Sequence, residues 1–144
     1  MILVDSEKKF RLDIVGYEFE GATSYHDSNW LNVSIEVEDN DLRWSAEDPC
    51  LSTSELIRLR DWLNNLPHIA EKGIYFTEHE LAFEFDRESS ILSVLLVYGF
   101  HPNAGKEGQD EDYKLDFSMN QHKINLLVSD IDRWLAKYPH RDEQ

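Results

Sequence analysis

Strict alternation of apolar and polar residues predicts several β-strands in the first third of the chain. Residues 10–15 alternate Phe, Leu and Ile with Arg and Asp, which is typical of a half-buried strand. Residues 31–38 do the same, with four apolar side chains on one face and Asn, Ser, Glu and Glu on the other. After an Asp-Asn-Asp turn at 39–41, the alternation resumes over 42–46. The pattern predicts a β-hairpin with its acids on the outer face and at the tip.

Two amphipathic helices are indicated by apolar residues at helical spacing. Ser52 and Glu55 have the S-x-x-E spacing of a capping box, which satisfies backbone donors at a helix N-terminus. The apolar stripe that follows comprises Leu56, Leu59, Trp62, Leu63 and Leu66, and Pro67 ends it. The second stripe comprises Ile124, Leu127, Val128, Ile131, Leu135 and Tyr138, and Pro139 ends it.

Between the two helices lie further strand-like segments at 74–76, 81–86, 91–100 and 113–119. Residues 91–100 are apolar on both faces, which predicts a central strand covered by a helix on at least one side. Residues 101–112 form a polar loop. The order of strands, helix, strands and helix predicts an α+β fold with a mainly antiparallel, strongly curved sheet and two helices.

The length and composition are those of one folded domain. A chain of 144 residues, expected to form a single domain over 1–144, is long enough to bury a core without a metal or a disulfide. Its single cysteine fits a reducing compartment. It has no apolar run of membrane-spanning length, and its N-terminus lacks the order of a signal peptide. We therefore expect a cytoplasmic protein.

The net charge changes this picture. Asp and Glu number 29 against 14 Lys and Arg, giving a formal charge of −15 at pH 7. Such a surface repels nucleic acid and anionic membranes and attracts basic protein partners. Solubility alone is the alternative explanation.

Sequence motifs for cofactor and metal binding are incomplete. The segment GFHPNAGKEG at 99–108 has five residues between its glycines where a phosphate-binding loop has four, and Glu107 replaces the Ser or Thr. A calcium loop starting at Asp39 lacks the Gly and the Glu that its sixth and twelfth positions need. No H-x-x-x-H pair is present for zinc. We expect no cofactor and no metal.

Catalytic signatures are also missing. None of the many carboxylates stands in a local setting that would raise its pKa, and Cys50 reads as a small buried hydrophobe. Two alternatives to a binding protein nevertheless stay open at this point. One is a small carboxylate-dependent hydrolase, and the other is an adaptor or structural subunit that pairs with itself.

A series of short motifs runs in a fixed order along almost the whole chain. They are Gly16, Tyr17 and Phe19; Asp27, Asn29, Trp30 and Leu31; Pro49, Cys50 and Leu51, with Glu55, Leu56, Trp62 and Leu63 in step; FTEHELAFEF at 76–85; LDF at 115–117; and YPHR at 138–141. With these motifs the sequence resembles the WapI family of bacterial immunity proteins, the antitoxins of contact-dependent toxins. Most of the motif residues read as fold-determining positions, with glycine in a bend and Trp and Leu in a core.

The resemblance implies a non-enzymatic cytoplasmic inhibitor that binds a cognate toxin domain. The family is named for a protein that protects its producer from a tRNA-cleaving nuclease domain, and a nuclease needs a cationic cleft for phosphates. An acidic inhibitor can mimic that polyanion and be steered toward the cleft. The residues that we expect to contact the partner are the acids of the hairpin and an exposed Trp: Glu36, Glu38, Asp39, Asp41, Glu47, Asp48 and Trp30.

Overall fold

The computed structural model describes residues 1–19, 28–68 and 71–141, and it contains two antiparallel four-stranded sheets, each followed by a helix. Sheet A consists of β1 (Ile2–Asp5), β2 (Lys8–Tyr17), β3 (Trp30–Asp39) and β4 (Leu42–Ser52), and α2 (Thr53–Asn64) follows it. Sheet B consists of β5 (Gly73–Tyr75), β6 (Leu81–Asp86), β7 (Ile91–Leu96) and β8 (Tyr113–Ser118). A short 3₁₀ helix, η1 (Tyr98–Phe100), follows β7, and α3 (Gln121–Lys137) follows β8.

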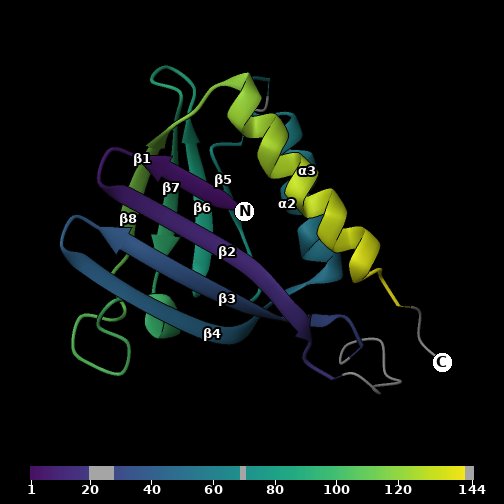
Figure 1. Cartoon of the computed structure of the whole chain (residues 1–144), viewed down its shortest axis with the longest axis horizontal. Helices are drawn as coiled ribbons and strands as arrows, with labels where there is room; N and C mark the ends of the chain where they lie inside the picture. Colours follow the sequence, from purple (N-terminus) through teal and green to yellow (C-terminus); the bar gives the residue numbers. More distant parts are fainter. Residues whose placement is uncertain (20–27, 69–70, 142–144) are drawn as a thin grey trace.

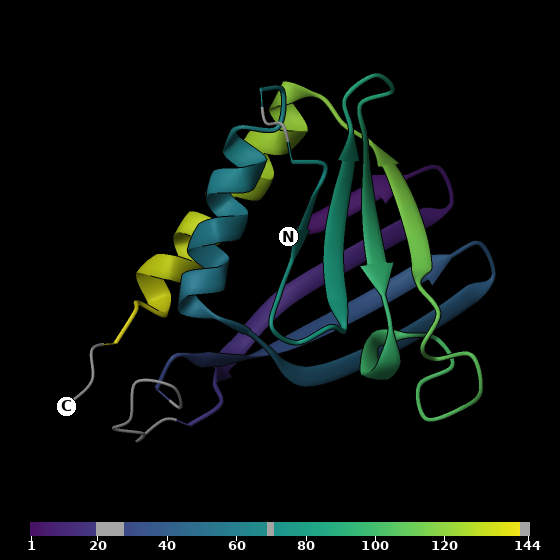
Figure 2. The same ribbon diagram turned by 180° about the vertical axis from the view of Figure 1, so that it is seen from behind.

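The two sheets pack face to face with their strands crossing (Figure 1), and their apolar side chains meet in the core between them. Viewed from behind, α2 and α3 lie side by side along one flank of the sheets (Figure 2). One hydrophobic cluster joins both sheets and both helices, and its largest fully buried side chains include Phe10, Phe83, Phe100 and Phe117. The outer face of sheet A therefore stays exposed to solvent. None of the described helices is long and apolar enough to span a membrane.

The α+β class, the antiparallel pairing and the two helices are confirmed, although the strands divide between two sheets. The apolar residues of 31–38 are all buried, as their alternation predicts. The capping box is present, since the Ser52 side chain accepts from the Glu55 amide and the Glu55 side chain accepts from the Ser52 amide. Cys50 is fully buried, and burial raises the pKa of its thiol.

Three strands differ from the sequence prediction. The first strand, β1, was not predicted, because four residues are too short for a convincing alternation. The strand β4 continues past 46 to Ser52, with a bulge that shifts its pairing opposite Leu31 and Asn32. The strand β7 is central, but it ends at Leu96, before Tyr98 adopts a φ of 52° and starts η1.

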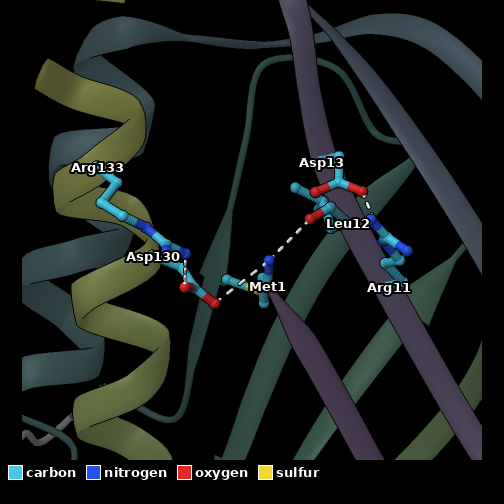
Figure 3. Close-up of polar contacts among 6 residues, drawn as sticks. All are labelled: Met1, Arg11, Leu12, Asp13, Asp130 and Arg133. Atoms are coloured by element: carbon cyan, nitrogen blue, oxygen red, sulfur yellow. Dashed lines mark hydrogen bonds and ion pairs between the residues drawn. The ribbon is translucent and has the colours of Figure 1, made fainter. Parts of the chain in front are cut away.

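A polar contact connects α3 to sheet A (Figure 3). The amino group of Met1 donates to the Leu12 carbonyl at 3.0 Å and lies 3.5 Å from an Asp130 carboxylate oxygen. Asp130 also pairs with Arg133 on the same helix. Burial lowers the pKa of the Met1 amino group, while the Asp130 charge opposes that shift.

Candidate functional site

The predicted acids of the hairpin do not share one environment. Glu36, Asp41 and Glu47 are exposed, and Glu38 is half-buried on the same outer face of sheet A. We call this region, comprising Glu36, Glu38, Asp41, Arg43, Ser45 and Glu47, the hairpin surface.

Basic residues of the neighbouring strands lie among these acids. Cross-strand pairing places Arg11 opposite Glu36 and Lys9 opposite Glu38. Arg43 lies 3.9 Å from Glu38 on its other side. The pattern of a single strand could not reveal these bases, because the partner of each position depends on sheet register. The hairpin surface is therefore acidic with basic residues interspersed.

Two shallow hollows mark the hairpin surface. The first, of about 300 Å³, is lined by Lys9, Glu36, Glu38, Arg43 and Ser45 among others. The second, of about 320 Å³, lies between the tips of the β1–β2 and β3–β4 hairpins and includes Asp41. Three of the predicted contact residues thus line concave parts of the surface.

Asp39 has a different role, because its side chain points toward sheet B. Its Oδ2 atom accepts a hydrogen bond of 2.5 Å from the Tyr113 hydroxyl. Burial, this hydrogen bond and the Asp39 charge together raise the pKa of Tyr113 to about 12. The Tyr113 ring also packs edge-on against Trp44, whose Nε1 atom donates to the Phe100 carbonyl at 2.9 Å. Asp39 therefore fastens the hairpin to sheet B.

We expect Tyr113→Phe to lower the free energy of unfolding by about 1.5–2 kcal/mol, because a hydrogen bond to a charged acceptor is lost. Chemical denaturation will measure this change. Tyr98→Phe, at an exposed tyrosine, is the matched control and should stay within about 0.5 kcal/mol of the wild type. Equal stabilities of the Tyr113 variant and the wild type would show that Asp39 has no such structural role.

Asp48 also points inward, toward Glu80, the residue immediately before β6. Glu80 is only 7% exposed, and its Oε2 atom is buried without a hydrogen-bond partner among the described residues. That atom lies so close to Gly99 that a Cβ there would collide with it. Burial, followed by the interaction with the Asp48 side chain and the charges of Asp48 and Glu78, raises the pKa of Glu80 to about 8.

A paired carboxyl with a raised pKa is the arrangement that a general acid requires. Substrate space is the second requirement. Neither Asp48 nor Glu80 lines the two larger hollows of the surface. One, of about 640 Å³, lies between the β6–β7 turn and α3, and the other, of about 600 Å³, lies between α2 and β5. Among the described residues, no group of three or more His, Cys, Asp or Glu could hold a metal ion.

Trp30 lies at the end of β3 opposite the hairpin tip. It begins β3, whereas Asp39 ends it, and nine strand residues span about 30 Å. Its side chain is half-buried. The structure therefore separates Trp30 from Asp39 and Asp41 at the hairpin tip, whereas Asp48 pairs with Val33, only three residues along β3 from Trp30.

A second group of acids lies near the hairpin and was not predicted as part of the site. Glu107, Asp110, Glu111 and Asp112 are exposed on the loop that precedes Tyr113. The Tyr113–Asp39 hydrogen bond holds the end of this loop against the hairpin. The acidic run EGQDED was a usable signal, but its position in space depends on a contact between residues 74 apart.

Several of the motif residues from the sequence meet at the other end of β3. We call Tyr17, Asn29, Thr53, His140 and Arg141 the C-terminal clamp. Asp27 lies outside the described residues. The chain after α3 runs toward the ends of β2 and β3 (Figure 1).

Asn29 is at the centre of the C-terminal clamp and is 4% exposed. Its Oδ1 atom accepts from the Arg141 amide at 2.7 Å and from the Thr53 hydroxyl at 3.2 Å. Its Nδ2 atom donates to the Arg141 carbonyl at 2.8 Å. Thr53, fully buried, also hydrogen-bonds to His140 Nδ1 at 2.7 Å.

The Arg141 side chain completes the C-terminal clamp. Its guanidinium stacks on the Tyr17 ring, 3.7 Å from the centroid, and donates to the Ser28 and Phe19 carbonyls. The Tyr17 hydroxyl donates to the Pro139 carbonyl at 2.6 Å. These contacts join the end of β2, the start of β3, the start of α2 and the chain after α3.

One of the solved structures that the chain matches is described as the plant transcriptional regulator PBF-2. The similarity covers 96% of this chain and 80% of that one, at 10% identity and a TM-score of 0.49. No curated protein matches the sequence. The model of the Immunity protein WapI-like family matches residues 1–139. The chain therefore belongs to the WapI-like family of immunity proteins.

Proposed function

We propose that this protein neutralises a cognate toxin domain by binding it directly, without catalysis, in the cytoplasm of the cell that makes it. The partner is a basic domain, expected to be a nuclease. No contact with nucleic acid or membrane is part of this function. The observation that carries the proposal is the combination of immunity-family membership with a net charge of −15.

The hairpin surface is the part of the molecule best suited to meet such a domain. It is concave, exposed and acidic, and the acids of the loop before Tyr113 increase the negative field beside it. A cationic cleft that binds phosphates is attracted to a field of this sign, and steering of this kind raises association rates. The bases Lys9, Arg11 and Arg43 among the acids give the surface a charge pattern, which favours one partner over other basic proteins.

Co-expression is the primary test of this function. A toxin domain encoded beside this gene should arrest growth when produced alone, and this protein should restore growth and co-purify with the domain. An unrelated immunity protein of similar charge is the control. Growth arrest that persists, with no complex recovered, would refute the proposal.

Reversal of Glu36, Asp41 and Glu47 to Lys should slow association with the toxin domain about 10- to 30-fold at low salt. All three side chains are exposed, so the melting temperature should fall by only a few degrees, chiefly through the new Lys opposite Arg11. Stopped-flow fluorescence at several salt concentrations will measure the rate.

The matched control reverses three exposed acids away from the hairpin, Asp61, Glu71 and Glu88. It applies the same change in net charge and should slow association much less. Equal slowing by both triple variants would mean that net charge acts without any contribution from the hairpin surface.

The Asp48–Glu80 pair is the feature that would favour a hydrolase instead. A variant with Asp48→Asn and Glu80→Gln keeps the shape of the pair and removes its acid chemistry. We expect this variant to rescue growth as well as the wild type does. Loss of rescue by a folded variant that still binds the toxin domain would support catalysis.

A further inference from the structure

We infer that the partner binds by adding an extended segment to the edge of β4, so that sheet A gains a fifth strand. This inference rests on the proposed function and specifies how the partner is held. β4 is the last strand of sheet A, so no further strand pairs with its outer side among the described residues, and the nearby η1 packs against β4 without joining the sheet. The residues concerned are Arg43, Ser45 and Glu47, which we call the free edge.

Strand register determines the direction of each backbone group. Asp39 and Leu42 flank a two-residue turn and form a hydrogen-bonded pair, so Trp44 and Ala46 also direct their backbone groups toward β3. The intervening residues of the free edge direct three amides and three carbonyls outward. The structure gives these six groups no hydrogen-bond partner among the described residues. All three residues are exposed, so water solvates them in the free protein.

At the edges of sheet B, charged side chains hydrogen-bond to backbone groups of the edge strands. At β8, Asp5 accepts from the Ser118 amide at 3.0 Å, and Lys8 donates to the Asp116 carbonyl at 2.5 Å. At β5, Arg58 donates to the Tyr75 carbonyl at 3.2 Å. Charged side chains that occupy edge groups in this way prevent pairing with other chains. Among the described residues, no side chain occupies the backbone groups of the free edge in this way. The free edge is also longer than the edge of β1, where Ile2 and Val4 direct their backbone groups outward.

The side chains beside the free edge define the segment that fits it. On the outer face lie Glu47 and, on β3, Glu36 and Glu38, while Arg43 is the one base on these two strands. On the inner face lie Trp44 and Ala46, which are half-buried and apolar. An incoming strand would therefore carry Lys or Arg at alternate positions and apolar residues between them. This pattern is the charge complement of the hairpin surface and agrees with a basic partner.

A second copy of the chain is the competing occupant. Two free edges paired antiparallel about Ser45 would place Arg43 opposite Glu47 of the other copy, which is locally favourable. Each copy, however, carries a charge of −15, and the acids of both hairpin surfaces would be brought together. We therefore assign the edge to a basic strand of the partner.

A short acetylated peptide of alternating lysine and valine is a direct probe of the free edge. At physiological salt it should slow hydrogen exchange at the Arg43, Ser45 and Glu47 amides, which NMR can follow one by one. The same peptide with its alternate amides N-methylated has the same charge but cannot pair as a strand. It should bind at least about tenfold more weakly, since the backbone hydrogen bonds are lost.

Ser45→Pro removes one outward amide and should weaken the lysine–valine peptide about tenfold, while Ser45→Thr, which keeps the amide and the charge, should not. Proline is tolerated where an edge amide faces solvent, and the melting temperature will verify folding. If Ser45→Pro does not fold, the comparison of the unmodified and N-methylated peptides on the wild-type protein still tests strand addition.

Each result of these measurements has a definite meaning. Equal binding of both peptides, or protection of other amides only, would overturn strand addition. Sedimentation that shows a wild-type dimer abolished by Ser45→Pro would assign the edge to a second copy instead. A toxin domain that is neutralised while the free-edge amides stay unprotected would refute this inference and leave the proposed function intact. If no toxin domain is neutralised, the proposed function is refuted. The peptide experiment then remains as the test of strand addition at the free edge.

Discussion

Asn29→Ala should lower the free energy of unfolding by about 3 kcal/mol, because three hydrogen bonds at a buried position are lost together. Two of them hold the backbone of Arg141, and the third holds the buried Thr53 hydroxyl. Alanine leaves these groups without their partner, and a buried group without a hydrogen bond costs about 1–3 kcal/mol. Chemical denaturation will measure the change.

The same substitution should release the chain after α3. Without Asn29, the segment from Pro139 to Arg141 loses both of these backbone hydrogen bonds, although contacts to Tyr17, Thr53 and the carbonyls near Ser28 are retained. Hydrogen exchange at the Arg141 amide should therefore accelerate more than exchange in β7. Asn125→Ala is the matched control, because Asn125 is exposed on α3, and it should change stability by no more than about 0.5 kcal/mol. A loss below 1 kcal/mol for Asn29→Ala would show that the C-terminal clamp contributes little to stability.

Glu80→Gln should make the protein more stable than the wild type at alkaline pH. The difference in the free energy of unfolding between variant and wild type should rise by about 2–3 kcal/mol, in favour of the variant, from pH 5 to pH 9. The pKa of Glu80 is raised to about 8 in the folded protein, against an ordinary value of 4.5. Between these two values the folded state binds more protons than the unfolded state. The wild type therefore loses stability as pH rises through this range, and the loss is complete once Glu80 has ionised.

The expected size is smaller than the full pKa shift implies, because Asp48 is half-buried and water screens the pair. Glutamine keeps the shape of Glu80, can donate to Asp48 and does not titrate. Denaturation of both proteins from about pH 5 to about pH 9 will give the difference. Parallel stability curves over that range would contradict the assignment.

Two further variants locate the cause of this pH dependence. Asp48→Asn removes the facing charge and should bring the pKa of Glu80 down, so the slope between pH 5 and pH 9 should decrease. Glu47→Gln alters an exposed glutamate on the same strand and should leave the slope of the wild type unchanged. NMR titration of the Glu80 carboxyl carbon will report its pKa directly.

Local patterns along the chain predicted the elements with strong periodicity. The alternation over 31–38 gave β3 with the correct buried face, and Ser52 with Glu55 gave the start of α2. These signals are local, since they depend on the side-chain period of a strand and on hydrogen bonds within one helical turn. The division into two sheets had no such signal, because it depends on which strands pair.

The candidate site was predicted only in part, for the same reason: local patterns place some of its residues, and contacts between distant residues place the others. Glu36, Asp41 and Glu47 lie on the outer face or at the tip as alternation and turn chemistry require. The inward positions of Asp39 and Asp48 became apparent only through Tyr113 and Glu80, which are 74 and 32 residues away in sequence. The C-terminal clamp joins Asn29 and Arg141, which are 112 residues apart in the sequence. The motifs that contain them could therefore be interpreted as fold-determining, but nothing in the sequence indicated that they are in contact.

The distance along β3 between the C-terminal clamp and the hairpin surface has a consequence for engineering. Glu47 pairs with Ser34, about 16 Å along β3 from Asn29, and Glu36 and Asp41 lie farther away. Substitutions this far apart act independently on stability, so the outer face of the hairpin can be randomised at little risk to folding. A library varied at Glu36, Asp41 and Glu47 and selected against a panel of foreign toxin domains should yield inhibitors with redirected specificity that retain the parental melting temperature to within a few degrees.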